Sequence, residues 1–140
     1  MKSLDWVIKN FKELETPLDG RFGRRLYQFL TPEQAKEMGY EEVDDNKEVI
    51  PWTEENILKQ LKEDVDFGIE KATDHRGISA SLMWEVCNSW CKVLENGLEL
   101  GDSDEEYGYY GHLLFKSIDE KYNFGLVDEN TFDKTFFERW

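Results

Sequence analysis

An apolar repeat in the middle of the chain constrains the fold more than any other feature. Four branched residues recur every four positions: Ile57, Leu61, Val65 and Ile69. This spacing places side chains along one face of an α-helix. Thr53 precedes the repeat as an N-cap, and Glu54 and Glu55 follow it in the first turn, where the helix dipole favours acids. The pattern therefore predicts an amphipathic helix from residue 54 to about residue 73.

The predicted helix has a polar side, and a second helix follows it. We expect its acids to lie mostly off the apolar stripe and to face water: Glu63, Asp64, Asp66 and Glu70. After a turn near Gly77, a second apolar series predicts a helix over residues 79–95 with this core: Leu82, Met83, Val86, Trp90, Val93 and Leu94. Two long amphipathic helices joined by a short turn most simply pack as an antiparallel hairpin.

Shorter patterns predict further helices on both sides of the hairpin. We expect them over residues 4–14, from the Thr31 cap to Gly39, over residues 110–122, and after Asn130. The sequence thus predicts a mainly α chain, residues 1–140 forming a single compact helical domain around a central antiparallel helix hairpin. Residues 21–30 and 40–52 also fit short strands, so a small two- or three-stranded β-sheet (α+β) stays open as an addition.

Charge limits the partners of this chain. The 140 residues carry 31 acids against 17 lysines and arginines, a net charge of −14. Two segments hold the excess: residues 33–70 have thirteen acids against four bases, and residues 95–140 have twelve against four. Such a surface repels nucleic acid and anionic membranes, whereas opposed potentials accelerate its encounter with a basic protein surface. We therefore expect no direct nucleic-acid or membrane binding.

One use of such a surface is nucleic-acid mimicry. Carboxylates on successive helical turns recur about every 5.4 Å along the axis, comparable with phosphates along one strand. The simpler alternative is that an acidic surface keeps a small protein soluble and monomeric, and composition alone favours this alternative. If the surface binds a partner, the expected contacts are the exposed acids of three segments: Glu41, Glu42, Asp44, Asp45, Glu48, Glu63, Asp66, Glu70, Asp102, Asp104, Glu105 and Glu106.

No pattern in the chain predicts catalysis, a metal or a cofactor. Cys87 and Cys91 stand four apart, but neither His75 nor His112 completes a zinc set, so the thiols are expected in the core. A calcium loop beginning at Asp102 would need Gly and Glu at its sixth and twelfth positions, where this chain has Tyr and Leu. We expect a non-enzymatic protein.

A basic cluster, Arg21, Arg24 and Arg25, stands among aromatic residues. Arginine beside aromatic rings suits phosphate or RNA, but internal pairing to a carboxylate such as Asp19 is the more economical interpretation in so acidic a chain. The chain also has no apolar run of the roughly 20 residues that a membrane helix needs, and its first residues are not typical of a signal peptide. With two cysteines, this favours a cytoplasmic setting.

Two stretches carry a resemblance: the run PLDGRFGRRL at residues 17–26 and the segment 52–97. They resemble small acidic, mostly uncharacterised proteins of phages and mobile elements of Gram-positive bacteria. Relatives of that kind include anti-CRISPR and other anti-defence inhibitors, several of which imitate DNA. The resemblance implies a non-enzymatic inhibitor that occupies a basic, nucleic-acid-binding surface of a host defence nuclease. It transfers no site residues.

A second interpretation is an interaction or adaptor protein of a mobile element. It would dock a partner, or a second copy of itself, through a hydrophobic surface. The aromatic residues of the C-terminal segment are the expected contacts: Phe132, Phe136, Phe137 and Trp140.

Overall fold

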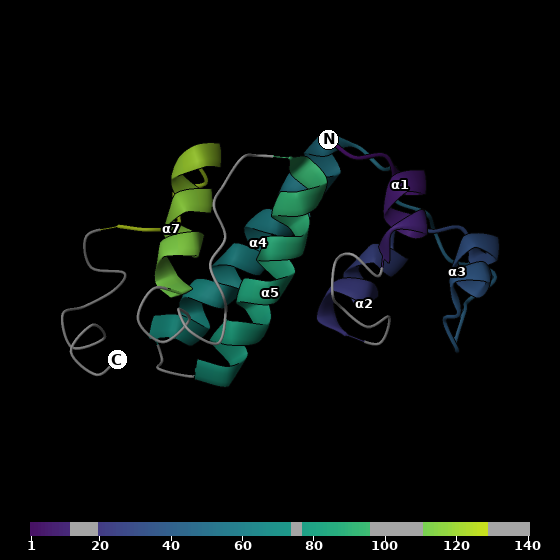
Figure 1. Ribbon diagram of the computed structural model, residues 1–140, viewed down its shortest axis with the longest axis horizontal. Helices are drawn as coiled ribbons and strands as arrows, with labels where there is room; N and C mark the ends of the chain where they lie inside the picture. Colours follow the sequence, from purple (N-terminus) through teal and green to yellow (C-terminus); the bar gives the residue numbers. More distant parts are fainter. Residues whose placement is uncertain (12–19, 74–76, 96–110, 129–140) are drawn as a thin grey trace.

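A computed structural model of the chain describes residues 1–11, 20–73, 77–95 and 111–128. Within these ranges the chain is mainly helical (Figure 1). The helices are α1 (Leu4–Lys9), α2 (Arg21–Tyr27), α3 (Pro32–Met38), α4 (Glu54–Thr73), α5 (Gly77–Leu94) and α7 (Gly111–Tyr122).

The helix ends follow from local sequence chemistry. Ser3 caps α1 by accepting a hydrogen bond from the backbone N–H of Trp6 at 3.1 Å. Thr31 and Gln34 form a full capping box at the start of α3, and Gly39 ends that helix in the left-handed conformation, at φ 104°. Thr53 accepts from the N–H of Asn56 at the start of α4. The predicted helix starts after Ser3, Thr31 and Thr53 are therefore confirmed.

The central helix hairpin is also confirmed. Helices α4 and α5 are joined across residues 74–76 and lie side by side, and the indole of Trp90 on α5 reaches Asp64 near the middle of α4 (Figure 1). The predicted stripe on α4 is buried, with Ile57, Leu61 and Val65 fully enclosed. Most side chains of α5 from Met83 to Leu94 are buried, although Leu82 is 38% exposed instead of lying in the core.

The remaining helices extend this core in two directions. Helix α7 packs against α4 and α5 and contributes Phe115 and Ile118. Helices α1, α2 and α3 gather at the other end of the molecule, where Phe22 lies edge-on to Trp90 with ring centres 4.8 Å apart (Figure 1). One continuous hydrophobic cluster includes residues from all six described helices.

The open possibility of a β-sheet is not supported. Residues 21–30 form α2 and the turn after it, and residues 40–52 form an irregular loop, so no strand occurs among the described residues. The first helix is also shorter than predicted. Helix α1 ends at Lys9, because the backbone of Asn10 leaves the helical conformation, at φ −112° and ψ 21°, and the Asn10 side chain donates to the carbonyl of Trp6. Among the described helices, none combines the length and apolarity that crossing a membrane requires.

Candidate functional site

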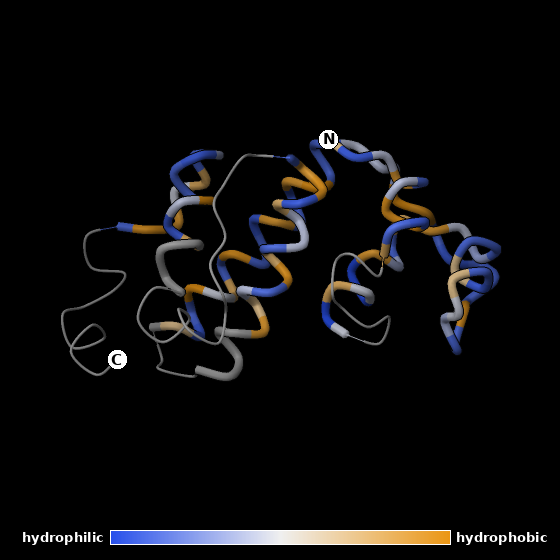
Figure 2. Tube along the Cα trace, in the orientation of Figure 1, coloured by the Kyte–Doolittle hydropathy of each residue, from blue (hydrophilic) through white to orange (hydrophobic). Residues whose placement is uncertain are grey.

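Helix α3 and the loop that follows it carry the most concentrated exposed charge in the described chain. We call this the acidic surface. Seven of its carboxylates are exposed to solvent: Glu33, Glu37, Glu41, Glu42, Asp44, Asp45 and Glu48. Two lysines accompany them within residues 33–48. In Figure 2, most of the tube through α3 is coloured as hydrophilic.

The loop of the acidic surface is fixed to α2 and the turn after it by hydrogen bonds. The hydroxyl of Tyr40 donates to the carbonyl of Gly23 at 2.6 Å. The hydroxyl of Tyr27 accepts from the backbone N–H of Asp44 at 2.9 Å, and the carbonyl of Gln28 accepts from the N–H of Ile50 at 2.9 Å. Burial raises the pKa of Tyr40 to about 12, which keeps its hydroxyl a donor. The loop is therefore attached at several points although it lacks regular secondary structure.

The two lysines do little to offset the charge of the acidic surface. The ammonium of Lys47 points inward: it donates to the carbonyl of Leu30 and lies 4.7 Å from the centre of the Tyr27 ring. Burial lowers the pKa of Lys47, with a smaller opposing effect from Asp44. Lys36 forms an exposed ion pair with Asp45 at 2.6 Å. Among the described residues, one of the seven carboxylates thus forms an ion pair, with Lys36. The other six have no ion-pair partner there, because the ammonium of Lys47 is directed to the carbonyl of Leu30.

The predicted row of acids on α4 is less uniform. Glu63, Asp66 and Glu70 are exposed, as expected. Exposed lysines interrupt the same surface, however, since Lys59 stands four residues before Glu63 and Lys62 four before Asp66. Opposite charges at this spacing are neighbours on a helix. Lys71 also lies 4.0 Å from Glu70. Helix α4 therefore presents alternating charge, which imitates a phosphate backbone less well than the loop does.

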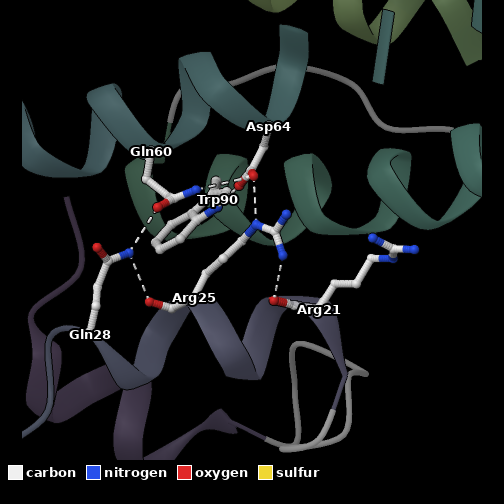
Figure 3. A network of polar contacts seen from close by, with 6 residues as sticks. All are labelled: Arg21, Arg25, Gln28, Gln60, Asp64 and Trp90. Carbon is white, nitrogen blue, oxygen red and sulfur yellow. Dashed lines mark hydrogen bonds and ion pairs between the residues drawn. The ribbon is translucent and has the colours of Figure 1, made fainter. Parts of the chain in front are cut away.

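The expectation that Asp64 faces water is wrong. Asp64 is only 1% exposed and lies at the junction of α2, α4 and α5 (Figure 3). Its Oδ1 atom accepts from Nε of Arg25 at 2.5 Å and from the amide of Gln60 at 3.2 Å. Its Oδ2 atom accepts from the indole N–H of Trp90 at 2.9 Å. The position was visible in the sequence, because Asp64 follows Leu61 by three residues and thus falls on the buried stripe.

The ion pair between Arg25 and Asp64 changes the interpretation of the basic cluster. Internal pairing to a carboxylate does occur, but the partner of Arg25 is Asp64, 39 residues away, and Asp19 lies outside the described residues. Arg21 holds its guanidinium 6.0 Å from the ring centre of Phe67, and Arg24 is exposed. The contact between Arg25 and Asp64 joins segments that no local sequence pattern links.

This buried network is built for holding helices together. Burial raises the pKa of Asp64, and Arg25, Trp90 and Gln60 offset that effect only in part. Burial, reinforced by the charge of Asp64, raises the pKa of the Cys87 thiol well above its usual range. A thiol with a raised pKa is a poor nucleophile, and the carboxylate is occupied by three donors. The arrangement joins three helices and offers no reactive group to a substrate.

The other candidate groups fall into two sets. Cys87 and Cys91 are buried, as predicted, and no cluster of metal-binding side chains occurs within residues 1–11, 20–73, 77–95 and 111–128. The remaining predicted residues lie outside the described part of the chain: the loop acids Asp102, Asp104, Glu105 and Glu106, His75, and the C-terminal aromatic residues Phe132, Phe136, Phe137 and Trp140.

Comparison of the chain with known protein families, with characterised proteins and with solved structures gave no match.

The residues that hold the loop of the acidic surface in place were not predicted from the sequence. The contacts of Tyr40 with Gly23 and of Tyr27 with Asp44 each span 17 residues, and no periodicity pairs them.

Proposed function

We propose that this chain is a non-enzymatic binding protein whose acidic surface occupies a basic, nucleic-acid-binding surface of a partner protein. The observation that carries the proposal is the attachment of the loop: Tyr40, Tyr27 and the carbonyl of Gln28 hold it against α2 while its carboxylates stand in solvent. A ligand that is already ordered loses less conformational entropy when it binds. The acidic surface therefore suits recognition better than a free acidic tail would.

The direction of Lys47 supports the same proposal. Protein surfaces usually intersperse charges of both signs and avoid large fields of one sign, except where such a field steers a partner. Lys47 instead uses its ammonium on the carbonyl of Leu30 and the ring of Tyr27. The result is a patch of net negative charge, with seven carboxylates and two lysines, which attracts a positive surface over roughly one Debye length, about 8 Å at physiological salt.

The acidic surface is a better candidate contact than α4. Six carboxylates there lack a lysine partner within ion-pair distance among the described residues, whereas lysines interleave with the acids of α4. Binding through the acidic surface places the interface at the end of the molecule far from α7 (Figure 1). Following the resemblance described above, the class of partner that we propose is a host defence nuclease, an RNA-guided one in particular.

Two variants with equal charge loss test this assignment. The acidic-surface variant is E37Q/E41Q/E42Q/E48Q. The control variant neutralises four exposed acids on α4, α5 and α7 and is E63Q/D66N/E85Q/E120Q. The assay measures how well each protein displaces a fluorescent DNA duplex from purified, guide-loaded RNA-guided nucleases at 100 mM salt.

We expect the acidic-surface variant to lose about tenfold or more in competition against a nuclease that the unmodified chain inhibits. The control variant should stay within about threefold. Equal losses in the two variants would show that net charge acts without a defined surface. If the unmodified chain displaces DNA from none of the nucleases, that class of partner is wrong.

A further inference from the structure

We infer that Asp64 and Arg25 form a positioning pair that fixes the register of α2 against α4 and thereby the placement of the acidic surface. The functional part of this inference rests on the proposed function above. The geometric part stands on the buried contacts alone (Figure 3).

Helix α2 packs on α5, and three side-chain contacts join α2 and its C-cap to α4 in antiparallel order. Arg21 lies against Phe67, Arg25 binds Asp64, and the amide of Gln28 donates to Oε1 of Gln60 at 2.9 Å. The three α2-side positions are spaced by four and three residues, so they share one face of the helical path. Their partners on α4 are spaced by three and four residues in the opposite direction. Two polar pairs and one contact between a guanidinium and an aromatic ring therefore line up along this seam.

Directional bonds distinguish this seam from the apolar contacts beside it. Phe22 and Leu26 face the core near Trp90, but apolar burial is non-directional and tolerates sliding. The carboxylate of Asp64 accepts from donors on α2, α4 and α5 at once, and a slip of α2 breaks the contact with Arg25. Sliding by one helical turn would move everything that α2 carries by about 5.4 Å.

Helix α2 and the turn after it transmit this register to the acidic surface. The carbonyls of Gly23, Gln28 and Leu30 and the hydroxyl of Tyr27 all bind the loop of residues 40–50. These groups lie within five residues of Arg25. A shift of Arg25 relative to Asp64 therefore carries the loop carboxylates with it.

The buried ion pair is not required for stability as such. Removing two charges from water offsets most of their attraction, and apolar replacements of similar volume are often as stable as the pair they replace. Apolar replacement of the pair can therefore test the position of α2 in a protein that still folds. The variant R25M/D64L should stay folded while the register of α2 becomes less well defined. The control R24M/D66L removes the same two residue types from exposed positions on the same two helices.

The experiment measures a distance between two spin labels. One label is attached at Glu41→Cys in the loop and the other at Lys92→Cys on α5, both exposed positions. Cys87 and Cys91 are buried, so the native chain without the introduced cysteines serves as the labelling blank. Pulsed electron spin resonance then gives the distance distribution, and urea denaturation gives the stability of each variant.

We expect R24M/D66L to keep the distribution of the unmodified chain. The distribution of R25M/D64L should broaden, or shift by up to about 5 Å, in a protein that is still folded but has a lower denaturation midpoint, because the buried indole N–H of Trp90 loses its acceptor. An unchanged distribution in folded R25M/D64L would overturn the inference. If R25M/D64L does not fold, the near-isosteric D64N decides by the same criterion.

Binding is read separately with the nuclease competition assay. Loss of competition in R25M/D64L, with full competition by R24M/D66L, supports the positioning role, because the carboxylates of the acidic surface are intact in both. A displaced label with competition unchanged in every variant supports the geometric inference and counts against the proposed function.

Discussion

Replacing Gly68 by alanine tests the packing of α7 on α4 most sharply. A Cβ atom on Gly68 would lie 2.5 Å from Cε1 and 2.6 Å from Cζ of Phe115. Real Cβ atoms do not approach other carbons this closely, so the ring has to move. Phe115 is 1% exposed and sits in the core cluster, which leaves it little room.

Two opposing effects decide the magnitude. Alanine favours the helix over glycine by about 1 kcal/mol. Forcing extra volume into a packed core costs about 1–3 kcal/mol, and a contact this short on a buried ring belongs at the upper end. We therefore expect G68A to lower the free energy of unfolding by about 2 kcal/mol.

Urea denaturation followed by circular dichroism measures this loss. The double variant G68A/F115L gives the new methyl group space. Its loss of unfolding free energy should therefore be smaller than the sum of the losses in G68A and F115L by about 1 kcal/mol or more. A G68A protein as stable as the unmodified chain, or more stable, would refute the packing of Phe115 against Gly68 described above.

Three further predictions concern titratable groups. Burial raises the pKa of Asp64 above its usual value of 3.8, so the stability that Asp64 contributes is fully present below that pH. This stability is lost as the pH rises through the pKa of the folded state. The unfolding free energy of the unmodified chain relative to D64N should therefore fall above about pH 4. Native Cys87 and Cys91 should react with Ellman's reagent far more slowly than in denatured protein, and equal rates would contradict their burial. In an absorbance titration, Tyr40 should ionise near pH 12, and Y40F should remove that step while loosening the loop from Gly23.

Much of the helical framework could be predicted because its signals are local. The repeat after Thr53 gave the bounds of α4, and the pattern Thr31 to Gly39 gave those of α3. Burial within α4 was harder to predict, since Asp64 was assigned by its charge to the solvent side although its position places it on the apolar stripe. The partner that makes its burial tolerable, Arg25, is 39 residues away.

The loop after α3 shows the limit of pattern analysis more clearly. Val43, Val49 and Ile50 suggested a strand, and strand pairing needs backbone partners. In the structure, the N–H of Ile50 donates to the carbonyl of Gln28 and the N–H of Asp44 donates to the hydroxyl of Tyr27, while the loop's own Tyr40 hydroxyl donates to Gly23. These contacts depend on where α2 lies, which only the tertiary fold determines. The exposure of the acids was predictable, but the attachment that holds them was not.

The salt dependence of binding tests the central claim most directly. For a nuclease that the chain inhibits, the dissociation constant is measured from 50 to 300 mM salt for the unmodified chain and for the variants E37Q/E41Q/E42Q/E48Q and E63Q/D66N/E85Q/E120Q. If the acidic surface makes the contact, affinity falls steeply with salt for the unmodified chain and the second variant, and much less steeply for the first. The same steep dependence in all three proteins would contradict the claim.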